Sequence, residues 1–389
     1  MSQKNDIHYN IDTLDKEGSQ INWILGERSN GKSYQVKHKK GIYRYWEDGV
    51  NYHASYRDKK KIEEVIINKK TKRFGLIRRL QEEIKPSAAI NYFSDIDVEK
   101  ITNGQYNTFE IFKERVYLAY YDIETRKTKR GEFIGYLFAL SVEQNYAGGS
   151  YLDITDLIFE EVITRKIYLQ NEPSKLMNLY CTIDRKRGTT RLWLPGNTIS
   201  KVCPYFEEWG IYDLIKGLKQ GEIKSRWIKT GDKDEDGIDV EVKISVEYCK
   251  SSGRSSFVIG KHSEMLNTGT WQTEPQPHLP KSINEYNKAF TIGFCYQSFK
   301  FLGDLLLDKT SRDMVWFVYP YYGEFDNKTI IFSDIIKPSR YWQRDIYRPQ
   351  LKNKRICEIL KTFVESNIFY SSDLCGTDFK QVIDFDIRK

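Results

Sequence analysis

Short apolar runs of strand length alternate with polar or glycine-containing segments along most of this chain. The run at residues 21–25 (INWIL) predicts a buried strand, and residues 34–46 read as the helix that follows it. Residues 50–56 look like a second strand, and the charged stretch 58–85 places its apolar positions at mostly helical spacing. Further strand-like runs lie at residues 115–121, 132–141, 157–159 and 190–195. This alternation predicts an α/β domain with a doubly wound sheet.

The pattern changes near residue 231. The segment 231–237 (GDKDEDG) is acidic and bounded by glycines, and the stretch 269–280 contains three prolines, so both predict linkers or turns. Residues 349–367 carry apolar positions at helical spacing. Strand-like runs precede them at residues 289–296, 299–307, 314–319 and 329–336. We therefore expect a first domain over residues 1–225, a linker or lid region over 226–280 and a second α/β domain over 281–389.

The composition narrows the class of protein. Of the 389 residues, 40% are hydrophobic and 14% aromatic, which is too much apolar material for a disordered chain. Lys and Arg number 61 against 54 Asp and Glu, and this net charge of +7 only mildly favours a polyanionic partner. No apolar run reaches the ~18 residues of a membrane span, and the first ten residues (MSQKNDIHYN) do not resemble a signal peptide. The six cysteines lack a C-x-x-C pair, as expected for reduced thiols in a cytosolic protein.

The strongest chemical signal follows the first predicted strand. Residues 26–33 read GERSNGKS and match the phosphate-binding pattern G-x-x-x-x-G-K-[ST] in full. In such a P-loop, backbone N–H groups and the start of the next helix surround phosphate oxygens. Lys32 would neutralise the β- and γ-phosphates of ATP, and the Ser33 hydroxyl would ligate Mg²⁺. The predicted nucleotide-binding residues are Gly26, Glu27, Arg28, Ser29, Asn30, Gly31, Lys32 and Ser33.

Hydrolysis also needs an acid near the metal, at the end of a neighbouring strand. Glu160 and Glu161 directly follow the apolar run 157–159. We predict that Glu160 belongs to the Mg²⁺ shell and that Glu161 orients the attacking water, although paired surface glutamates after a strand are also common. The basic turn 182–191 is usually a solvated loop, but in ring ATPases an Arg can enter the neighbouring subunit's site. Asn197, which ends the next strand, could sense the γ-phosphate.

These segments, taken in order, resemble the DNA-encapsidation ATPases of small short-tailed phages. The resemblance is carried by residues 26–33, 135–141 (GYLFALS), 157–162 (LIFEEV), 185–187, 192–197 and 204–206, and more weakly by residues 290–378. It implies an ASCE-type P-loop NTPase domain followed by a domain with a ribonuclease-H-like fold. It also implies a homo-oligomeric ring, pentameric in the family, that translocates double-stranded DNA at the portal vertex of a prohead in the cytoplasm of the infected bacterial host. In some members a packaging RNA bridges the ring and the prohead.

The resemblance also implies roles for individual residues. Lys32 and Ser33 match the phosphate and Mg²⁺ residues, and Glu161 matches the catalytic glutamate. Arg185 stands where the family's trans-acting arginine falls, and Asn197, as already suggested by its place in the chain, matches the sensor. Glu160 departs from the family's usual Asp by one methylene. A further basic residue, Arg187, lies close enough to Arg185 for either to be the trans-acting arginine.

The second domain raises the question of nuclease activity. A ribonuclease-H-like nuclease needs a carboxylate on its first strand to bind two metal ions. The candidate first strand, residues 289–296 (AFTIGFCY), has none, and we place Asp304 and Asp308 at the end of the next strand. We therefore predict a vestigial nuclease-like domain without nuclease activity.

Other readings stay open. A P-loop phosphotransferase acting on a small or nucleotide substrate is the main alternative, and an adaptor with a degenerate ATP site is a third. The stretch 232–237 copies half of a calcium loop but lacks its final Glu, so an acidic linker is preferred. Basic and aromatic residues interleave over 337–348, as at a nucleic-acid or protein contact. Arg57 is a candidate phosphate-coupling residue. The lysine-rich stretches 59–61 and 69–73 read as solvated helix faces, with DNA or RNA contact as the alternative.

Overall fold

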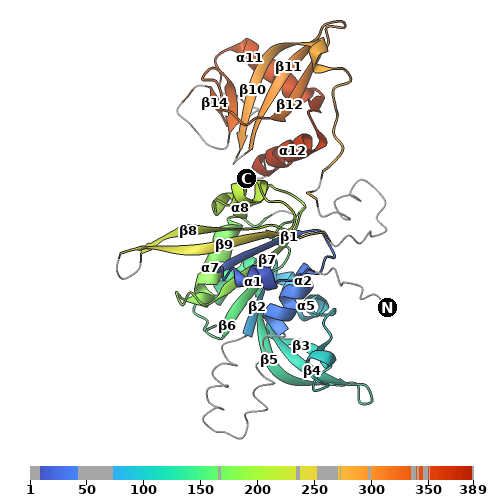
Figure 1. The fold of residues 1–389 in the computed structure, drawn as a ribbon, viewed down its shortest axis with the longest axis vertical. Helices are drawn as coiled ribbons and strands as arrows, with labels where there is room; N and C mark the ends of the chain where they lie inside the picture. Colours follow the sequence, from blue (N-terminus) through green and yellow to red (C-terminus); the bar gives the residue numbers. More distant parts are fainter. Residues whose placement is uncertain are drawn as a thin grey trace. The chain divides into compact units, whose positions relative to one another are not determined.

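The computed structural model shows two compact units. It describes residues 9–42, 73–164, 168–233, 237–251, 270–271, 273–296, 299–333, 339, 341–344, 349 and 351–387. The first unit comprises Met1–Ile199, Gly217–Ser256 and Leu266–Thr270, and the second comprises Ser200–Lys216, Phe257–Met265 and Trp271–Lys389 (Figure 1). The expected boundary at residue 225 falls inside a strand of the first unit, β8 (Ile223–Lys233).

The first unit is built on a nine-stranded sheet with the order β3-β4-β5-β2-β6-β7-β1-β9-β8. The strands from β5 to β9 in this order are parallel, whereas β3, β4 and β8 are antiparallel additions at the edges. The strands are β1 (Ile21–Gly26), β2 (Arg73–Arg78), β3 (Thr108–Phe112), β4 (Arg115–Asp122), β5 (Lys127–Ala139), β6 (Ile154–Phe159), β7 (Arg191–Asn197), β8 and β9 (Asp239–Tyr248). The predicted α/β class and the strands read at residues 21–25, 115–121, 157–159 and 190–195 are confirmed.

The helices of the first unit are mostly short. They are α1 (Asp12–Lys16), α2 (Lys32–Val36), the π-helical η1 (Lys37–Ile42), the 3₁₀ segments η2 (Gln81–Ile84) and η3 (Leu140–Tyr146), α5 (Pro86–Tyr92), α6 (Val98–Ile101) and α7 (Glu172–Asp184). The helix expected over residues 34–46 is present as α2 and η1 up to residue 42, and its remainder lies outside the described residues. The expected strand 50–56 and Arg57 also lie outside them.

The helical prediction for residues 58–85 is wrong at residues 73–78, which form strand β2, while residues 81–84 form the 3₁₀ segment η2. Phe74, Leu76 and Ile77 are all buried, since β2 lies inside the parallel part of the sheet with both faces covered. A strand of this kind has a continuous apolar run, which periodicity does not separate from a helix. Gly75 fits there because an added Cβ would lie 2.6 Å from a Leu157 side-chain carbon.

The second unit contains a six-stranded sheet with the order β14-β13-β10-β11-β12-β15. Strands β10, β11 and β12 form an antiparallel meander, while β13 is parallel to β10, β14 to β13 and β15 to β12. The strands are β10 (Tyr286–Tyr296), β11 (Phe299–Asp308), β12 (Met314–Pro320), β13 (Ile330–Ser333), β14 (Trp342–Gln343) and β15 (Ile368–Tyr370). The accompanying helices are α8 (Pro204–Glu208), α9 (Tyr212–Lys216), the 3₁₀ turn η4 (Ile283–Glu285), α11 (Lys354–Glu365) and α12 (Asp373–Ile387).

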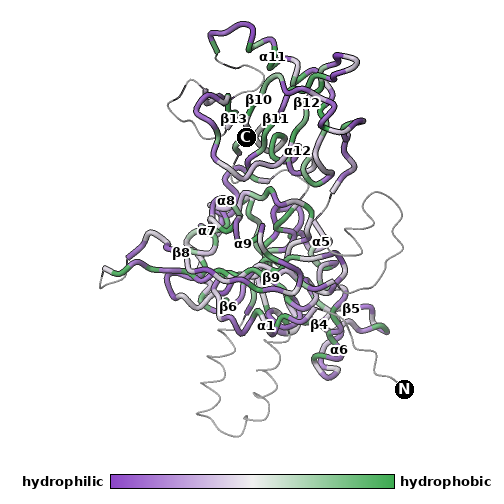
Figure 2. Tube along the Cα trace, turned by 45° about the horizontal axis from the view of Figure 1, so that its top comes forward, coloured by the Kyte–Doolittle hydropathy of each residue, from purple (hydrophilic) through white to green (hydrophobic). Residues whose placement is uncertain are grey.

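Aromatic side chains form much of the second unit's core. Phe294 on β10 lies 5.2 Å from Phe363 and 4.9 Å from Phe379, measured between ring centroids, so α11 and α12 both contact this strand. Figure 2 shows hydrophobic segments along β10 and β12. None of the helices in the described part of the chain combines the length and the apolar character that a membrane span requires.

Candidate nucleotide-binding site

The predicted phosphate loop connects β1 to α2. Gly26 is the last residue of β1, and Lys32 is the first residue of α2. Gly31 has a φ of 91°, a left-handed conformation that glycine adopts without steric cost. An added Cβ on Gly26 would lie 3.1 Å from the Cβ of Cys249, so the first glycine permits a close approach to the chain after β9. The motif therefore occupies the strand–loop–helix context that phosphate binding requires.

Lys32 is buried and directed at acceptors around the loop. Its ammonium group donates to the carbonyl oxygens of Glu27 and Gly26, the latter at 3.3 Å, and to the side-chain oxygen of Asn197 at 3.1 Å. Asn197 reaches this position because β7 is parallel to β1, with Asn197 paired to Gly26. Burial lowers the pKa of Lys32 to about 8. The structure thus brings the predicted sensor and the P-loop lysine together.

Glu160 and Ser33 also meet. Glu160 follows the last residue of β6, and the Ser33 hydroxyl donates to its Oε2 at 3.0 Å. The Tyr92 hydroxyl, from α5, donates to the other carboxylate oxygen at 2.9 Å. Burial raises the pKa of Glu160, which these two hydrogen bonds and the nearby Lys37 and Arg78 oppose.

This pair of oxygen atoms fits a magnesium ion. Mg²⁺ binds oxygen ligands octahedrally at about 2.0–2.1 Å, so two adjacent ligands lie about 2.9 Å apart. The Ser33 and Glu160 oxygens are 3.0 Å apart. Within the described ranges, no group of three or more His, Cys, Asp and Glu residues could hold a metal ion. Any Mg²⁺ here would therefore take its other ligands from phosphate and water, as is usual for this ion.

Glu161 is the next residue and differs from Glu160 in its surroundings. Its side chain is 64% exposed, and its backbone φ is 56°. Arg78, the last residue of β2, reaches it at 3.4 Å and binds Glu83 more closely, at 2.8 Å. Sequence reasoning missed Arg78 and Arg79 because the stretch 58–85 is predicted to be mostly helical, and it missed Tyr92 because only tertiary packing brings Tyr92 to Glu160. The signal that could have revealed the arginines is the run RFGLIRR, an apolar strand with two arginines at its end.

The two basic candidates after α7 have different environments. The Arg187 guanidinium donates to the carbonyl oxygens of Asp184 at 2.9 Å and Leu152 at 2.8 Å, and to others nearby. Exposed Arg185 donates to one backbone oxygen, that of Gly149, at 2.6 Å. Arg187 also contacts the carbonyl of Ile154, the first residue of β6, at 3.4 Å. Glu160 follows the other end of this strand, ~20 Å away for a strand of this length.

The carboxylates of the second unit are engaged in structural contacts. Asp304 accepts hydrogen bonds from Thr291 at 2.6 Å and Tyr319 at 3.1 Å. Asp308 accepts from Lys281 at 2.7 Å and from two backbone N–H groups, and these bonds lower its pKa to about 2. The predicted placement at a strand end holds for Asp308 but not for Asp304, which lies within β11. Strand β10 contains no carboxylate.

The structure also bears on several weaker predictions. Asp232 lies in β8, and the strands on either side of the expected acidic linker form a hairpin, β8–β9. Arg73, expected on a solvated helix face, begins β2 and binds Asp153 at 2.6 Å, so that expectation is wrong for this residue. The lysine-rich stretches 59–61 and 69–72 lie outside the described residues, as does much of 337–348.

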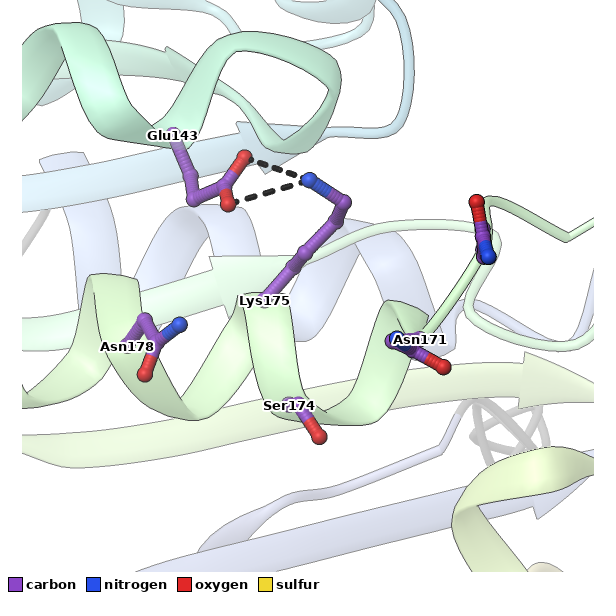
Figure 3. A pocket seen from close by; sticks show the side chains of 6 residues that line it. Glu143, Asn171, Ser174, Lys175 and Asn178 are labelled. Carbon is purple, nitrogen blue, oxygen red and sulfur yellow. Dashed lines mark hydrogen bonds and ion pairs between the residues drawn. The ribbon is translucent and has the colours of Figure 1, made fainter.

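A polar hollow of about 360 Å³ lies beside α7 (Figure 3). Lys175 extends from α7 toward Glu143 of η3, and its ammonium is 3.0 Å from each carboxylate oxygen. The hollow is lined by Glu143, Gln170, Asn171, Ser174, Lys175 and Asn178. None of these belongs to the phosphate loop or to the acidic pair after β6, so this hollow is separate from the candidate nucleotide site.

Comparisons with known proteins point to one family. Residues 55–220 match the family model described as Podovirus DNA encapsidation protein (Gp16), a range that includes Glu160, Glu161, Arg185 and Asn197 and begins after the P-loop. The "DNA packaging protein" of Bacillus phage phi29 is 27% identical over 194 residues, which cover 48% of this chain and 45% of that protein. That of Bacillus phage B103 is 27% identical over 194 residues, covering 49% and 48%. The chain thus spans about half the length of the curated relatives it matches.

A solved structure agrees with the fold. "The bacteriophage Phi-29 viral genome packaging motor assembly" contains a chain that aligns with 98% of this chain and 99% of its own length, at a TM-score of 0.50 and 18% sequence identity. This similarity concerns the fold alone.

Proposed function

We propose, because residues 55–220 match the podovirus DNA encapsidation family, that this chain is the ATPase of a viral packaging motor, which hydrolyses ATP to translocate double-stranded DNA into a prohead. The observation that carries the proposal is the meeting of Lys32, Ser33 and Asn197 with Glu160 at the carboxyl ends of three neighbouring strands. This is where open α/β sheets bind their ligands.

Each residue has a separate task in the proposed reaction. Lys32 and the loop N–H groups bind the phosphates, and ATP would replace the carbonyl oxygens that hold the Lys32 ammonium. Ser33 and Glu160 would hold Mg²⁺, which would supply positive charge to offset that of the phosphates. Glu161 orients the attacking water with its exposed carboxylate, and Asn197 contacts the γ-phosphate.

Arg185 is the proposed trans-acting residue. It directly follows α7, and its near neighbour Arg187 contacts the first residue of β6, at the end of that strand opposite to Glu160. Arg185 is therefore suited to a neighbouring subunit's site rather than its own. Arg187 is less suited, because backbone carbonyl oxygens already occupy its guanidinium group. An arginine added to the transition state from outside stabilises charge on the transferred phosphoryl group. This assignment requires a homo-oligomeric ring.

The finer fold assignments are also proposals. Strand β7 separates the P-loop strand β1 from the acidic strand β6, which supports an ASCE-type domain. In the second unit, three antiparallel strands are followed by two that are parallel to the first, which supports a ribonuclease-H-like fold. The engaged Asp304 and Asp308 and the absence of a carboxylate from β10 support the loss of nuclease activity. DNA cleavage with Mg²⁺ or Mn²⁺ would contradict it.

The proposed partners follow from this role. They are double-stranded DNA, the portal of the prohead and, if this chain resembles those family members that use one, a packaging RNA. The protein would act in the cytoplasm of the infected bacterial host, assembling transiently at the portal vertex.

The test is steady-state ATP hydrolysis with and without long double-stranded DNA, for the wild type and Glu161→Gln. Stimulation by DNA that is lost in the variant is the expected result. Turnover that ignores DNA and survives the substitution would contradict the assignment and favour a phosphotransferase. If neither protein turns over ATP in solution, the same comparison is made on portal-bearing proheads, and its result decides whether the proposed function stands.

A further inference from the structure

One buried arginine connects three parts of the candidate site. Arg79 directly follows β2, and its Nε and Nη2 atoms each lie 2.8 Å from a different carboxylate oxygen of Glu172. Glu172 is the first residue of α7, and its side chain is fully buried. Two parallel hydrogen bonds of this kind give an arginine–carboxylate pair a fixed orientation as well as strength.

The same guanidinium group also binds the chain after β6. Its Nη1 donates to the carbonyl oxygen of Glu161 at 3.2 Å, and its Nη2 donates to that of Val162 at 3.1 Å. The ring of Phe159, the last residue of β6, lies 5.5 Å from the guanidinium carbon. Arg79 therefore holds the backbone on which the proposed catalytic glutamate stands.

Glu161 depends on such support more than Glu160 does. The carboxylate of Glu160 is fixed by Ser33 and Tyr92, whereas that of Glu161 is largely exposed and has a 3.4 Å contact with Arg78. The backbone of Glu161 is also left-handed, which is uncommon for a residue other than glycine and persists where the surroundings impose it.

We propose that Arg79, with Glu172 as its buried counterion, is a positioning residue for Glu161. It holds the two carbonyl groups of the loop and thereby fixes the direction in which the Glu161 carboxylate projects. The inference rests on the proposed function, because it takes Glu161 as the residue that orients water. Small displacements of such a group reduce the rate of reaction without weakening substrate binding.

Lysine cannot replace the arginine in this role. A lysine ammonium keeps the positive charge but is a point donor, whereas the planar guanidinium binds both carboxylate oxygens and both carbonyl oxygens at fixed angles. Arg79→Lys thus separates geometry from charge. The matched control is Arg73→Lys, at the other end of β2, where Arg73 pairs with Asp153 at 2.6 Å and donates to a backbone oxygen at 2.9 Å.

The experiment measures kcat and KM for ATP hydrolysis by the full chain on DNA, together with the Kd of a fluorescent ATP analogue. We expect Arg79→Lys to lower kcat about 10- to 100-fold, with KM and Kd within about twofold of wild type. Arg73→Lys should change kcat less than about twofold. In a Glu161→Gln background, Arg79→Lys should cause no further loss, because residues that act as a unit are not additive.

Equal losses in Arg79→Lys and Arg73→Lys, or a full further loss in the double variant, would overturn the proposal. If Arg79→Lys does not fold, Glu172→Gln, which keeps the side chain's shape, must give the same fall in kcat. If wild-type turnover does not depend on Glu161, the proposed function fails. In that case the positioning role of Arg79 is tested by hydrogen exchange at residues 161–164. Arg79→Lys should accelerate this exchange, and an unchanged exchange rate would refute the role.

Discussion

The hydroxyl of Tyr92 offers a sharp test of the metal site. It donates at 2.9 Å to the buried Glu160 carboxylate, whose other oxygen accepts from Ser33. Tyr92→Phe removes one of these two donors and little else. A hydrogen bond to a charged group contributes about 1.5–3 kcal/mol, which corresponds to about 10- to 100-fold in an equilibrium constant. Loss of an outer partner of a metal ligand typically weakens metal binding by about the same factor.

The assay is ATP hydrolysis as a function of Mg²⁺ concentration at saturating ATP. We expect Tyr92→Phe to raise the half-saturating Mg²⁺ concentration about 10- to 100-fold and to recover most of its activity when Mg²⁺ is high. Tyr136→Phe is the matched control, because Tyr136 donates at 3.0 Å to Asp153, which is not part of the nucleotide site. An unchanged Mg²⁺ dependence in Tyr92→Phe, or an equal shift in Tyr136→Phe, would refute the reasoning.

Tyr92→Phe should also shift the pH dependence of ATP hydrolysis in a direction that the structure predicts. Burial already raises the pKa of Glu160, and only the ionised carboxylate binds Mg²⁺. Removing the tyrosine donor raises this pKa further, because hydrogen bonds to a carboxylate favour its charged form. The acid side of the rate–pH profile, measured at limiting Mg²⁺, should therefore move to higher pH in Tyr92→Phe. A shift to lower pH would contradict the assigned donor.

Four further substitutions separate structural from functional roles. Arg187→Ala should lower Tm by several degrees, because it removes four guanidinium hydrogen bonds to backbone carbonyl groups, three of them part-buried. Arg185→Ala should keep Tm within about 1 °C and lose ATPase activity only in assembled rings. Gly26→Ala should weaken binding of a fluorescent ATP analogue and cost about 1–3 kcal/mol in a denaturant titration, because its Cβ would meet Cys249 at 3.1 Å. Asp304→Asn should destabilise the chain, and both this variant and the wild type should leave DNA intact in a Mn²⁺ cleavage assay.

The nucleotide site could be predicted where its residues are close in sequence. The P-loop is a contiguous motif with fixed spacing, and Glu160 and Glu161 directly follow an apolar strand. Asn197 was predicted from its place at a strand end, and the structure puts it beside Lys32 because β7 is parallel to β1. The prediction of these residues needs only the local sequence and the rule that the carboxyl ends of parallel strands meet at one edge of a sheet.

Other parts depend on tertiary contacts that one sequence does not display. Strand β2 was read as helical, because a strand buried on both faces lacks alternation. The helical prediction therefore hides Arg78, at the end of β2, and Arg79, directly after it, although the run RFGLIRR carries a signal for both. Tyr92 and Glu160 are 68 residues apart in the sequence, and only the packing of α5 brings them together. Arg187 resembled Arg185 in sequence, and only the hydrogen bonds of its guanidinium group distinguish them.

In the proposed function, ATP hydrolysis at Lys32 and Glu161 moves double-stranded DNA into a prohead. The most direct measurement incubates portal-bearing proheads, linear DNA and ATP with the protein, then adds a nuclease and quantifies the full-length DNA that survives. Wild-type protein should protect DNA in an ATP-dependent manner, and Glu161→Gln should bind ATP yet protect none. Protection by Glu161→Gln equal to wild type, or no protection by wild-type protein that hydrolyses ATP on the same proheads, would contradict the account.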